Sequence, residues 1–344
     1  DFGNKKSAKQ FLTFGEAQKN RAVIDWKNYK PITPTFTGTK VLSNYDLSEI
    51  AAYIDWQPFF IAWEMHGKFP AILTDEVIGK EATNLYNDAK KLLKQVIDEK
   101  WLTAKAAVGF WPANKVAADT VELKSDAGII KLEFLRQQIK KAAGQPNLSL
   151  ADFISPGVQN NSPIEDAATS SLEIGRSDHL GAFSVTIQGI EAHIRHFENN
   201  LDDYNKIILQ ALADRLAEAF AELLHAKTRT EYWGYVKDEH LTNDEMIKEE
   251  YQGIRPAPGY PACPDHTEKY KLFELLGGEE ATGIHLTESL AMYPAASVCG
   301  WYFANPDSKY FGVGKISKDQ LEDYAQRKGM SLDDASRWLR PILE

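Results

Sequence analysis

Hydrophobic residues between about positions 202 and 226 recur every three or four residues, which is the spacing of an amphipathic α-helix. The apolar members of this series are Leu209, Leu212, Ala213, Leu216, Phe220, Leu223 and Leu224. The opposite face carries three carboxylates, Asp214, Glu218 and Glu222. The pattern predicts one long helix, with an acidic row of the kind that is ordinarily a solvated surface.

Weaker patterns predict the other elements. Residues 81–100 have helical spacing, and residues 46–63 predict a helix that is interrupted near Pro58. Short strand-like runs lie at residues 106–110, 120–123, 151–154 and 182–187. Later runs at residues 286–293, 297–303 and 310–316 are separated by turn residues and predict an antiparallel meander. Because helices and strands alternate without a regular βαβ repeat, the fold class is predicted to be α+β.

The two ends of the chain differ in pattern. Residues 1–40 show little sustained period and are interpreted as a linker with a lead-in strand, whereas residues 41–344 form the predicted domain. Two helices are predicted to close the chain. Ser317 with Gln320 forms an expected capping box at the start of the first, and Ser331 caps the second.

Composition narrows the class of protein. The 344 residues carry 39 basic and 49 acidic side chains, a net charge of -10, which argues against a nucleic-acid footprint and an anionic membrane partner. No apolar run reaches the roughly 18 residues of a membrane-spanning helix. Two cysteines in a chain of this length predict no disulfide framework. A cytoplasmic location is therefore expected.

The common catalytic motifs do not fit. Residues 312–314 lack the third glycine of a dinucleotide-binding fingerprint, and no phosphate-binding P-loop is present. His193 and His196 have no evident third metal ligand, and Cys263 has only His266 as a sequence neighbour of the right type. We therefore expect neither a catalytic residue nor a metal site in this chain.

Residues 255–264, RPAPGYPACP, place Arg255 in a segment with four prolines. Proline holds its preceding residue in an extended conformation and removes amide donors, so Arg255 is presented from a stiff backbone rich in bare carbonyls. This chemistry suits a ligand with a carboxylate and a positive centre. A surface loop tied down by prolines is an equally open interpretation.

Asp55 lies just before Pro58, among the aromatic residues of positions 56–63. A carboxylate at such an interruption is either a helix cap or a hook for a ligand's amino group. Local sequence favours the cap and leaves the hook open.

Residues 250–264, EYQGIRPAPGYPACP, resemble the signature of the C-terminal activation domain of cobalamin-dependent methionine synthase. Further blocks match in the same order, at residues 55–60, 202–206, 211–219, 286–289, 296–298, 300–303 and 306–310. The resemblance covers nearly everything from about residue 45 onward.

This resemblance implies a single C-shaped α+β domain with a twisted, largely antiparallel sheet, flanking helices and S-adenosylmethionine in a shallow groove on its inner face. The family's ligand-binding positions correspond to Asp55, Glu218, Glu250, Arg255, Ala257, Gly259, Tyr260, Tyr310 and Phe311. Asp55 is implied to take the ligand's amino group, Arg255 its carboxylate, and Glu218 with Glu250 the sulfonium end. The resemblance thereby implies that the acidic row of the long helix is a wall of the groove and not only a solvated surface.

The implied task is repair of an oxidised cofactor. S-adenosylmethionine would supply a methyl group, and a flavodoxin-like protein or flavin reductase one electron, to return cob(II)alamin to methylcobalamin. Cobalamin would be held by a partner domain of methionine synthase, because residues 178–181 do not fit the family's cobalamin motif. The module could be excised or separately encoded. Two alternatives stay open: a free-standing S-adenosylmethionine-binding protein that reactivates another corrinoid enzyme or senses the ligand, and a scaffold without a ligand.

Overall fold

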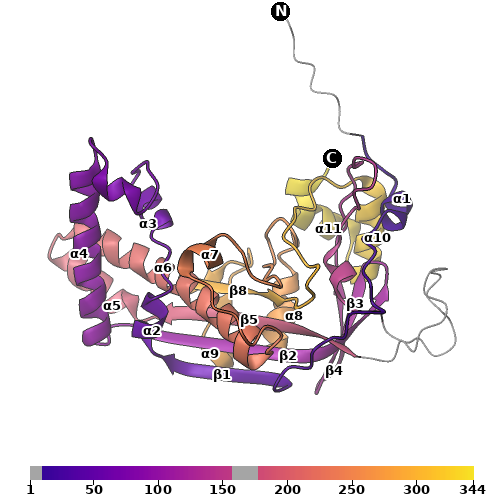
Figure 1. The fold of residues 1–344 in the computed structure, drawn as a ribbon, viewed down its shortest axis with the longest axis horizontal. Coiled ribbons are helices and arrows are strands. Elements are labelled where there is room, and N and C mark those ends of the chain that lie inside the picture. The colour runs from indigo at the N-terminus through magenta and orange to yellow at the C-terminus, as the bar shows by residue number, and fades with distance from the viewer. Residues whose placement is uncertain (1–9, 157–176) are drawn as a thin grey trace, which may run out of the picture.

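The computed structural model describes residues 10–156 and 177–344, which form a C-shaped α+β domain (Figure 1). A six-stranded sheet forms the base of the C, in the order β4-β3-β2-β5-β8, with β1 also paired to β2. Its strands are β1 (Gly38–Tyr45), β2 (Thr103–Ala117), β3 (Thr120–Ser125), β4 (Gly128–Glu133), β5 (Asp178–Gln188) and β8 (Ser297–Tyr302). All of these strand pairs are antiparallel, so the predicted fold class and sheet type are confirmed.

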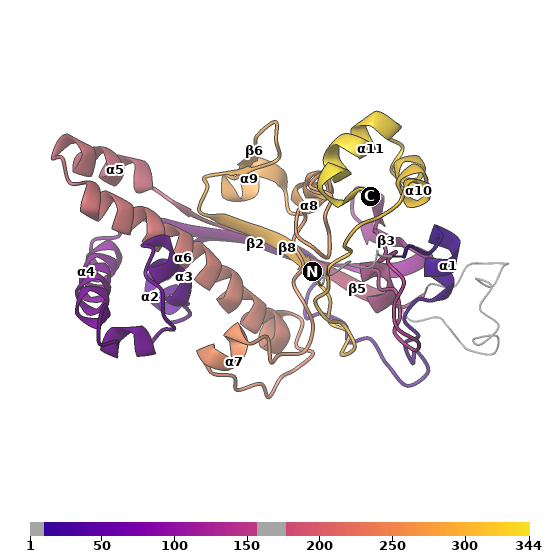
Figure 2. The same ribbon diagram turned by 90° about the horizontal axis from the view of Figure 1, so that it is seen from above.

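One arm of the C is built on α6 (Asp203–Lys227), the helix that the hydrophobic pattern predicted most clearly. Figure 2 shows α6 lying alongside the sheet, with α2 (Leu47–Ala51), α3 (Gln57–Ala62) and α4 (Gly79–Asp98) on its other side. The apolar face of α6, from Leu209 to Leu224, is buried between them. Burial of this stripe fixes the rotation of α6 about its axis and thereby where its acidic row points.

The opposite arm carries α10 (Lys318–Lys328) and α11 (Leu332–Leu339), which share a small core of their own, with the N-terminal α1 (Phe14–Lys19) nearby. Residues of the N-terminal segment lie against this arm. The Phe14 amide donates to Asp319 at 2.6 Å, and the Leu12 amide donates to the Gln138 carbonyl at 2.9 Å. The described part of the first forty residues is thus packed onto the body.

The remaining elements are short. They are η1 (Ala71–Thr74), η2 (Leu150–Phe153), α5 (Ile190–Asn199), η3 (Thr228–Tyr232), α7 (Asn243–Ile247), α8 (Glu268–Leu275), α9 (Gly278–Thr282), β6 (His285–Leu286), β7 (Met292–Tyr293) and η4 (Arg340–Ile342). The strands β6 and β7 form a separate hairpin.

Several sequence-based predictions of local structure are wrong. Residues 310–316 form no strand, and residues 286–293 contribute two short strands of a hairpin instead of one strand, so the predicted three-stranded meander is absent. Residues 151–153 fall in a 3₁₀ turn instead of a strand. The capping box of Ser317 does not form, because the Gln320 side chain is used elsewhere: its Oε1 accepts from the Arg136 amide at 2.7 Å, and its amide donates to the Arg136 carbonyl at 3.0 Å. For Gln320, a long-range contact thus replaced the local one.

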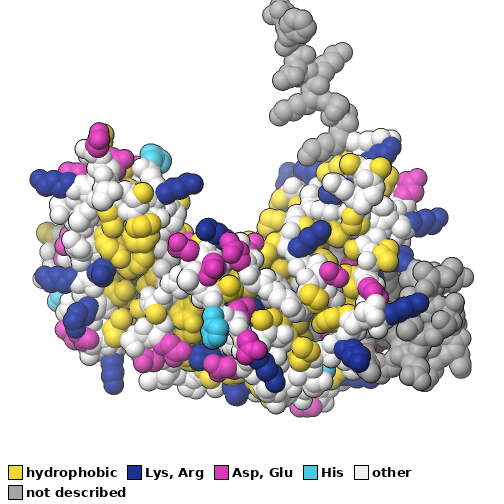
Figure 3. All heavy atoms as spheres, in the orientation of Figure 1, with side chains coloured by type: hydrophobic (Ala, Val, Ile, Leu, Met, Phe, Trp, Pro, Cys, Tyr) yellow, Lys and Arg dark blue, Asp and Glu magenta, His cyan; other side chains and the backbone are white. Residues whose placement is uncertain are grey.

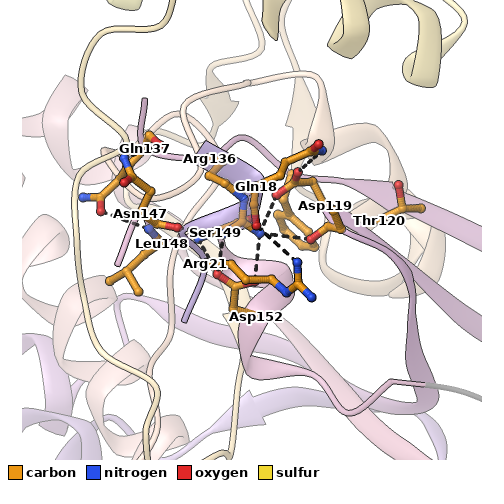
Figure 4. A network of polar contacts seen from close by, with 12 residues as sticks. Gln18, Arg21, Asp119, Thr120, Arg136, Gln137, Asn147, Leu148, Ser149 and Asp152 are labelled. Atoms are coloured by element: carbon orange, nitrogen blue, oxygen red, sulfur yellow. Dashed lines mark hydrogen bonds and ion pairs between the residues drawn. The ribbon is translucent and has the colours of Figure 1, made fainter. Parts of the chain in front are cut away.

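A buried polar network joins the sheet to this second arm (Figure 4). The Arg136 side chain is fully buried and makes two parallel bonds to Asp152, at 2.7 and 2.8 Å. It also contacts Asp119 at 2.8 Å and the carbonyls of Ala118 and Asn147 at 3.0 and 2.7 Å. Such a cluster holds its segments in one arrangement, since each charge depends on its partners when water is excluded.

Candidate functional site

A groove of about 270 Å³ is lined by α6, by residues 53–58 at the junction of α2 and α3, by α7 and the segment after it, and by Arg255. Its charged lining residues are Asp55, Arg215, Glu218, Glu222, Glu249 and Arg255. Figure 3 shows acidic side chains gathered in this hollow, flanked by the apolar surfaces of the arms. With four carboxylates against two guanidinium groups, the groove is electronegative and suits a cationic ligand.

Arg255 is presented to the groove by an extended backbone beside β8. Ile254 and Phe303 exchange both backbone hydrogen bonds at 3.0 Å, and the Trp301 amide donates to the Pro256 carbonyl at 2.9 Å. Because side chains alternate along an extended chain, the buried Ile254 and Pro256 leave Arg255 facing α6. The proline-rich sequence thus sets the direction of this guanidinium.

Two side chains of α6 bind the Arg255 guanidinium. Its Nη1 and Nη2 donate to the two carboxylate oxygens of Glu222 at 3.1 and 2.7 Å, and Nη1 also lies 3.0 Å from His225 Nδ1. The Arg255 side chain remains 20% exposed. Burial by itself lowers the pKa of Arg255, but the carboxylate of Glu222 outweighs it and leaves the pKa raised.

His225 forms the floor beneath Arg255. It is fully buried, stacks on Tyr302 at 5.2 Å between ring centres, and meets the edge of Tyr251 at 4.8 Å. Burial, with Arg229 and Arg255 nearby, holds the pKa of His225 well below its usual value, so the ring is neutral. Because arginine only donates, His225 Nδ1 must accept and the ring proton resides on Nε2.

Tyr310 is brought to Arg255 from 55 residues away: its hydroxyl accepts from the Arg255 amide at 3.0 Å and lies 3.1 Å from the Tyr251 hydroxyl. Phe311 points elsewhere and packs edge-on against Phe153, with ring centres 6.4 Å apart. The predicted Tyr310 and Phe311 pair is therefore split between the site and the core.

The position of Asp55 is compatible with both roles considered from the sequence, a helix cap and a partner for a ligand's amino group. Its Oδ1 accepts from the Gln57 amide at 2.9 Å, which starts α3, while the side chain also lines the groove. Pro58 lies in the first turn of α3, where a missing amide hydrogen has no effect on the helix, so the interruption comes before it. Capping fixes the carboxylate at the groove wall and leaves Oδ2 without a hydrogen bond among the described residues.

The two predicted glutamates are placed differently. Glu218 lines the groove, but Glu250 does not, and its neighbour Glu249 does. Glu249 has a left-handed backbone with φ of 59°, which turns the chain after α7 and exchanges the directions of these adjacent side chains. Burial raises the pKa of Glu249, with Arg255 opposing the shift.

The second half of the proline-rich motif lies beyond the groove lining. Gly259 has φ of 93°, and a Cβ there would come within 2.2 Å of the His266 ring, so only glycine fits. Its amide donates to the Cys263 carbonyl at 2.7 Å, which closes a tight turn. Ala257 is half-buried and Tyr260 is 65% exposed, so both border open surface next to Arg255.

Sequence reasoning missed several residues that complete the site: Arg215, His225, Glu249 and Tyr251. Glu222 did carry a signal, because it follows Glu218 by one helical turn in the acidic row of α6. His225 carried none, since a histidine on the buried side of a helix is ordinarily part of the core.

Two further findings bear on the site. Within residues 10–156 and 177–344, no group of three or more histidine, cysteine, aspartate or glutamate side chains is placed to hold a metal ion. Among the helices of these same residues, none is both long and apolar enough to cross a membrane.

Comparison with known proteins agrees with this geometry. The family model of the vitamin B12-dependent methionine synthase activation domain matches residues 46–329. A crystal structure described as the MetH reactivation domain bound to AdoHcy is similar at a TM-score of 0.89 and 46% sequence identity, covering 97% of this chain and 98% of that one. The chain therefore belongs to the family of vitamin B12-dependent methionine synthase activation domains.

Proposed function

We propose that this chain binds S-adenosylmethionine in the groove and presents it as the methyl donor for reductive methylation of oxidised cobalamin. One observation carries the proposal: a single groove contains the carboxylate of Asp55 and the guanidinium of Arg255, with further carboxylates beside them. An amino-acid ligand needs an acid for its ammonium and a planar donor pair for its carboxylate. AdoHcy in the similar solved structure carries the same amino-acid end.

The surplus of acids suits the sulfonium. A sulfonium has no proton to donate, so it is stabilised by nearby negative charge, which Glu218 and Glu249 supply in place of a hydrogen bond. At neutral pH S-adenosylmethionine has a net charge of plus one, whereas its demethylated product is neutral overall. The electronegative groove accordingly favours the methylated form.

The acceptor and reductant come from elsewhere. Cobalamin held by the partner domain would supply the reduced metal nucleophile, and the residues of this chain would hold the methyl donor whose sulfur is the leaving group. This chain therefore needs no general base, and its part is to position the methyl group. We propose the cobalamin-binding domain of methionine synthase as partner, a flavodoxin-like protein or flavin reductase as electron donor, and the cytoplasm as location.

Reactivation in trans tests this function. The chain, a cobalamin-binding domain of the synthase, a reductant and S-adenosylmethionine should together convert cob(II)alamin to methylcobalamin, followed by its absorption spectrum. We expect no methionine synthesis from the chain alone. Calorimetric binding of S-adenosylmethionine without any reactivation would instead favour the second candidate, a free-standing binding protein for another corrinoid enzyme or for ligand sensing.

Asp55→Asn is expected to keep the fold and weaken S-adenosylmethionine binding by about tenfold, because a neutral amide replaces a charge-assisted partner of the ammonium. The measurement is calorimetric titration with S-adenosylmethionine and with an analogue that lacks the amino group. Only the first ligand should lose affinity. Asp75→Asn is the matched control, because Asp75 caps the amides of Val77 and Ile78 outside the groove. Equal losses for both ligands would remove Asp55 from the ammonium site.

A further inference from the structure

The guanidinium of Arg255 has two edges that can each form a pair of parallel hydrogen bonds. One edge consists of Nη1 and Nη2, and the other of Nε and the second hydrogen of Nη2. Glu222 occupies the first edge, with Oε1 at 3.1 Å from Nη1 and Oε2 at 2.7 Å from Nη2. The side chain of Glu222 is only 13% exposed, so the pair is largely shielded from water.

Counting donors shows what remains for a ligand. The two hydrogens of Nη1 are shared among Glu222, His225 Nδ1 at 3.0 Å and the Tyr251 hydroxyl at 3.3 Å. Nη2 uses one hydrogen on Glu222. In the part of the chain that the structure describes, Nε has no hydrogen-bond partner. The edge formed by Nε and Nη2 is therefore the one that can donate hydrogen bonds to a ligand carboxylate.

We call Glu222, His225 and Tyr251, which together bind the Nη1 and Nη2 atoms of Arg255, the clamp. Their own positions are fixed by further contacts. His225 is fully buried and stacked on Tyr302. The ring of Tyr251 lies under the guanidinium of Arg229, with 4.4 Å between the guanidinium carbon and the ring centre. Glu222 projects from the C-terminal half of α6, the longest of the described helices. The clamp thus transfers the rigidity of the core to the end of a long, flexible side chain.

We propose that Glu222 is a positioning residue: it holds the Nη1/Nη2 edge of Arg255 so that the Nε/Nη2 edge meets the carboxylate of S-adenosylmethionine. This inference rests on the proposed function of the groove. A guanidinium free to rotate would have to be ordered upon binding, and a clamped one has already lost that freedom. Glu222 itself does not touch the ligand in this arrangement.

The test compares two ligands that differ in the carboxylate. S-adenosylmethionine has a net charge of plus one, and its decarboxylated form, which Arg255 cannot hold, has a charge of plus two. Glu222→Gln is expected to weaken binding of S-adenosylmethionine by about tenfold, and that of the decarboxylated ligand, which loses only a nearby negative charge, by no more than about threefold. Glu222→Asp, which keeps the charge but is too short to span both nitrogens, should also be impaired for S-adenosylmethionine.

Two controls sharpen the test. Glu198→Gln on α5 removes one acidic charge at a side chain that is 51% exposed, and it should bind both ligands like the parent. In an Arg255→Lys background, Glu222→Gln should cause little further loss of S-adenosylmethionine affinity, because an ammonium has no planar pair of edges that Glu222 could orient. Thermal unfolding of each variant verifies that the fold is retained.

Other results would overturn the inference. Tighter binding of S-adenosylmethionine by Glu222→Gln would make Glu222 a competitor of the ligand carboxylate. A loss that is equal for both ligands, or larger for the doubly charged one, would make Glu222 part of the groove's negative charge only. Failure of the parent chain to bind S-adenosylmethionine would instead refute the proposed function, before any variant is measured.

Discussion

Arg136→Met is expected to lower the free energy of unfolding by about 3 to 5 kcal/mol, the cost of removing one partner from a buried ion pair. Arg136 is fully buried, and its loss leaves Asp119 and Asp152, each 2% exposed, with their charges poorly compensated. The carbonyls of Ala118 and Asn147 also lose their donor. Methionine fills most of the volume, so a cavity contributes little.

Urea unfolding followed by tryptophan fluorescence measures this loss. Arg337→Met is the matched control, because Arg337 is 69% exposed and pairs with Asp334 at 3.3 Å on the surface. An exposed pair of this kind contributes about 0 to 1 kcal/mol. Similar losses for the two variants would contradict the view that burial makes the Arg136 cluster important.

The same variant has a pH signature. In the parent, burial raises the pKa of Asp152, but Arg136 and Lys115 outweigh it and the pKa is lowered. Such a group adds stability above its unfolded pKa of about 3.9 and loses that contribution as the pH falls. Removing Arg136 raises the pKa of Asp152 in the folded variant. The free energy of unfolding of the variant therefore falls less than that of the parent as the pH is lowered. The stability difference should therefore narrow as the pH is lowered through this range.

Arg255→Ala is expected to weaken S-adenosylmethionine binding by about 2 to 4 kcal/mol, because the ligand carboxylate loses its charge-assisted partner and Glu222 is left unpaired in the groove. Arg255→Lys should recover only part of the affinity, since an ammonium cannot reproduce the planar fork. Calorimetric titration of the folded variants gives both values. An unchanged dissociation constant for Arg255→Ala would exclude Arg255 from the ligand site.

The decarboxylated ligand separates the two effects of this substitution. It cannot use Arg255 for recognition, and removing the arginine also removes a positive charge that repels it. Its binding to Arg255→Ala should therefore equal or exceed its binding to the parent, opposite to the result for S-adenosylmethionine. A parallel loss for both ligands would point to a collapsed groove.

Much of the scaffold could be predicted from the sequence because it depends on local periodicity. The helical spacing from Leu209 to Leu224 predicted α6, and the spacing at residues 81–100 predicted α4. The prolines after Arg255 predicted an extended segment, which lies beside β8 in the structure. These features follow from steric limits on the backbone and from burial of one face, both of which a short window of sequence contains.

The site required contacts between distant segments. Arg255 and Glu222 are 33 residues apart, and the hydroxyl of Tyr310 reaches the Arg255 amide across 55 residues. Neither spacing has a local signature. The backbone turn at Glu249 decided that Glu249, and not Glu250, faces the groove, a distinction that two adjacent glutamates cannot reveal by composition.

The sequence by itself determined the elements, the family and the residue types available for the groove. Only the tertiary structure decided which polar groups already have a hydrogen-bond partner. The Gln320 side chain binds Arg136 instead of capping the helix with Ser317, and Glu222 binds one edge of Arg255. The physical reason is that a polar side chain removed from water must find a partner, and the partner with the best geometry is chosen by the packing of the whole chain.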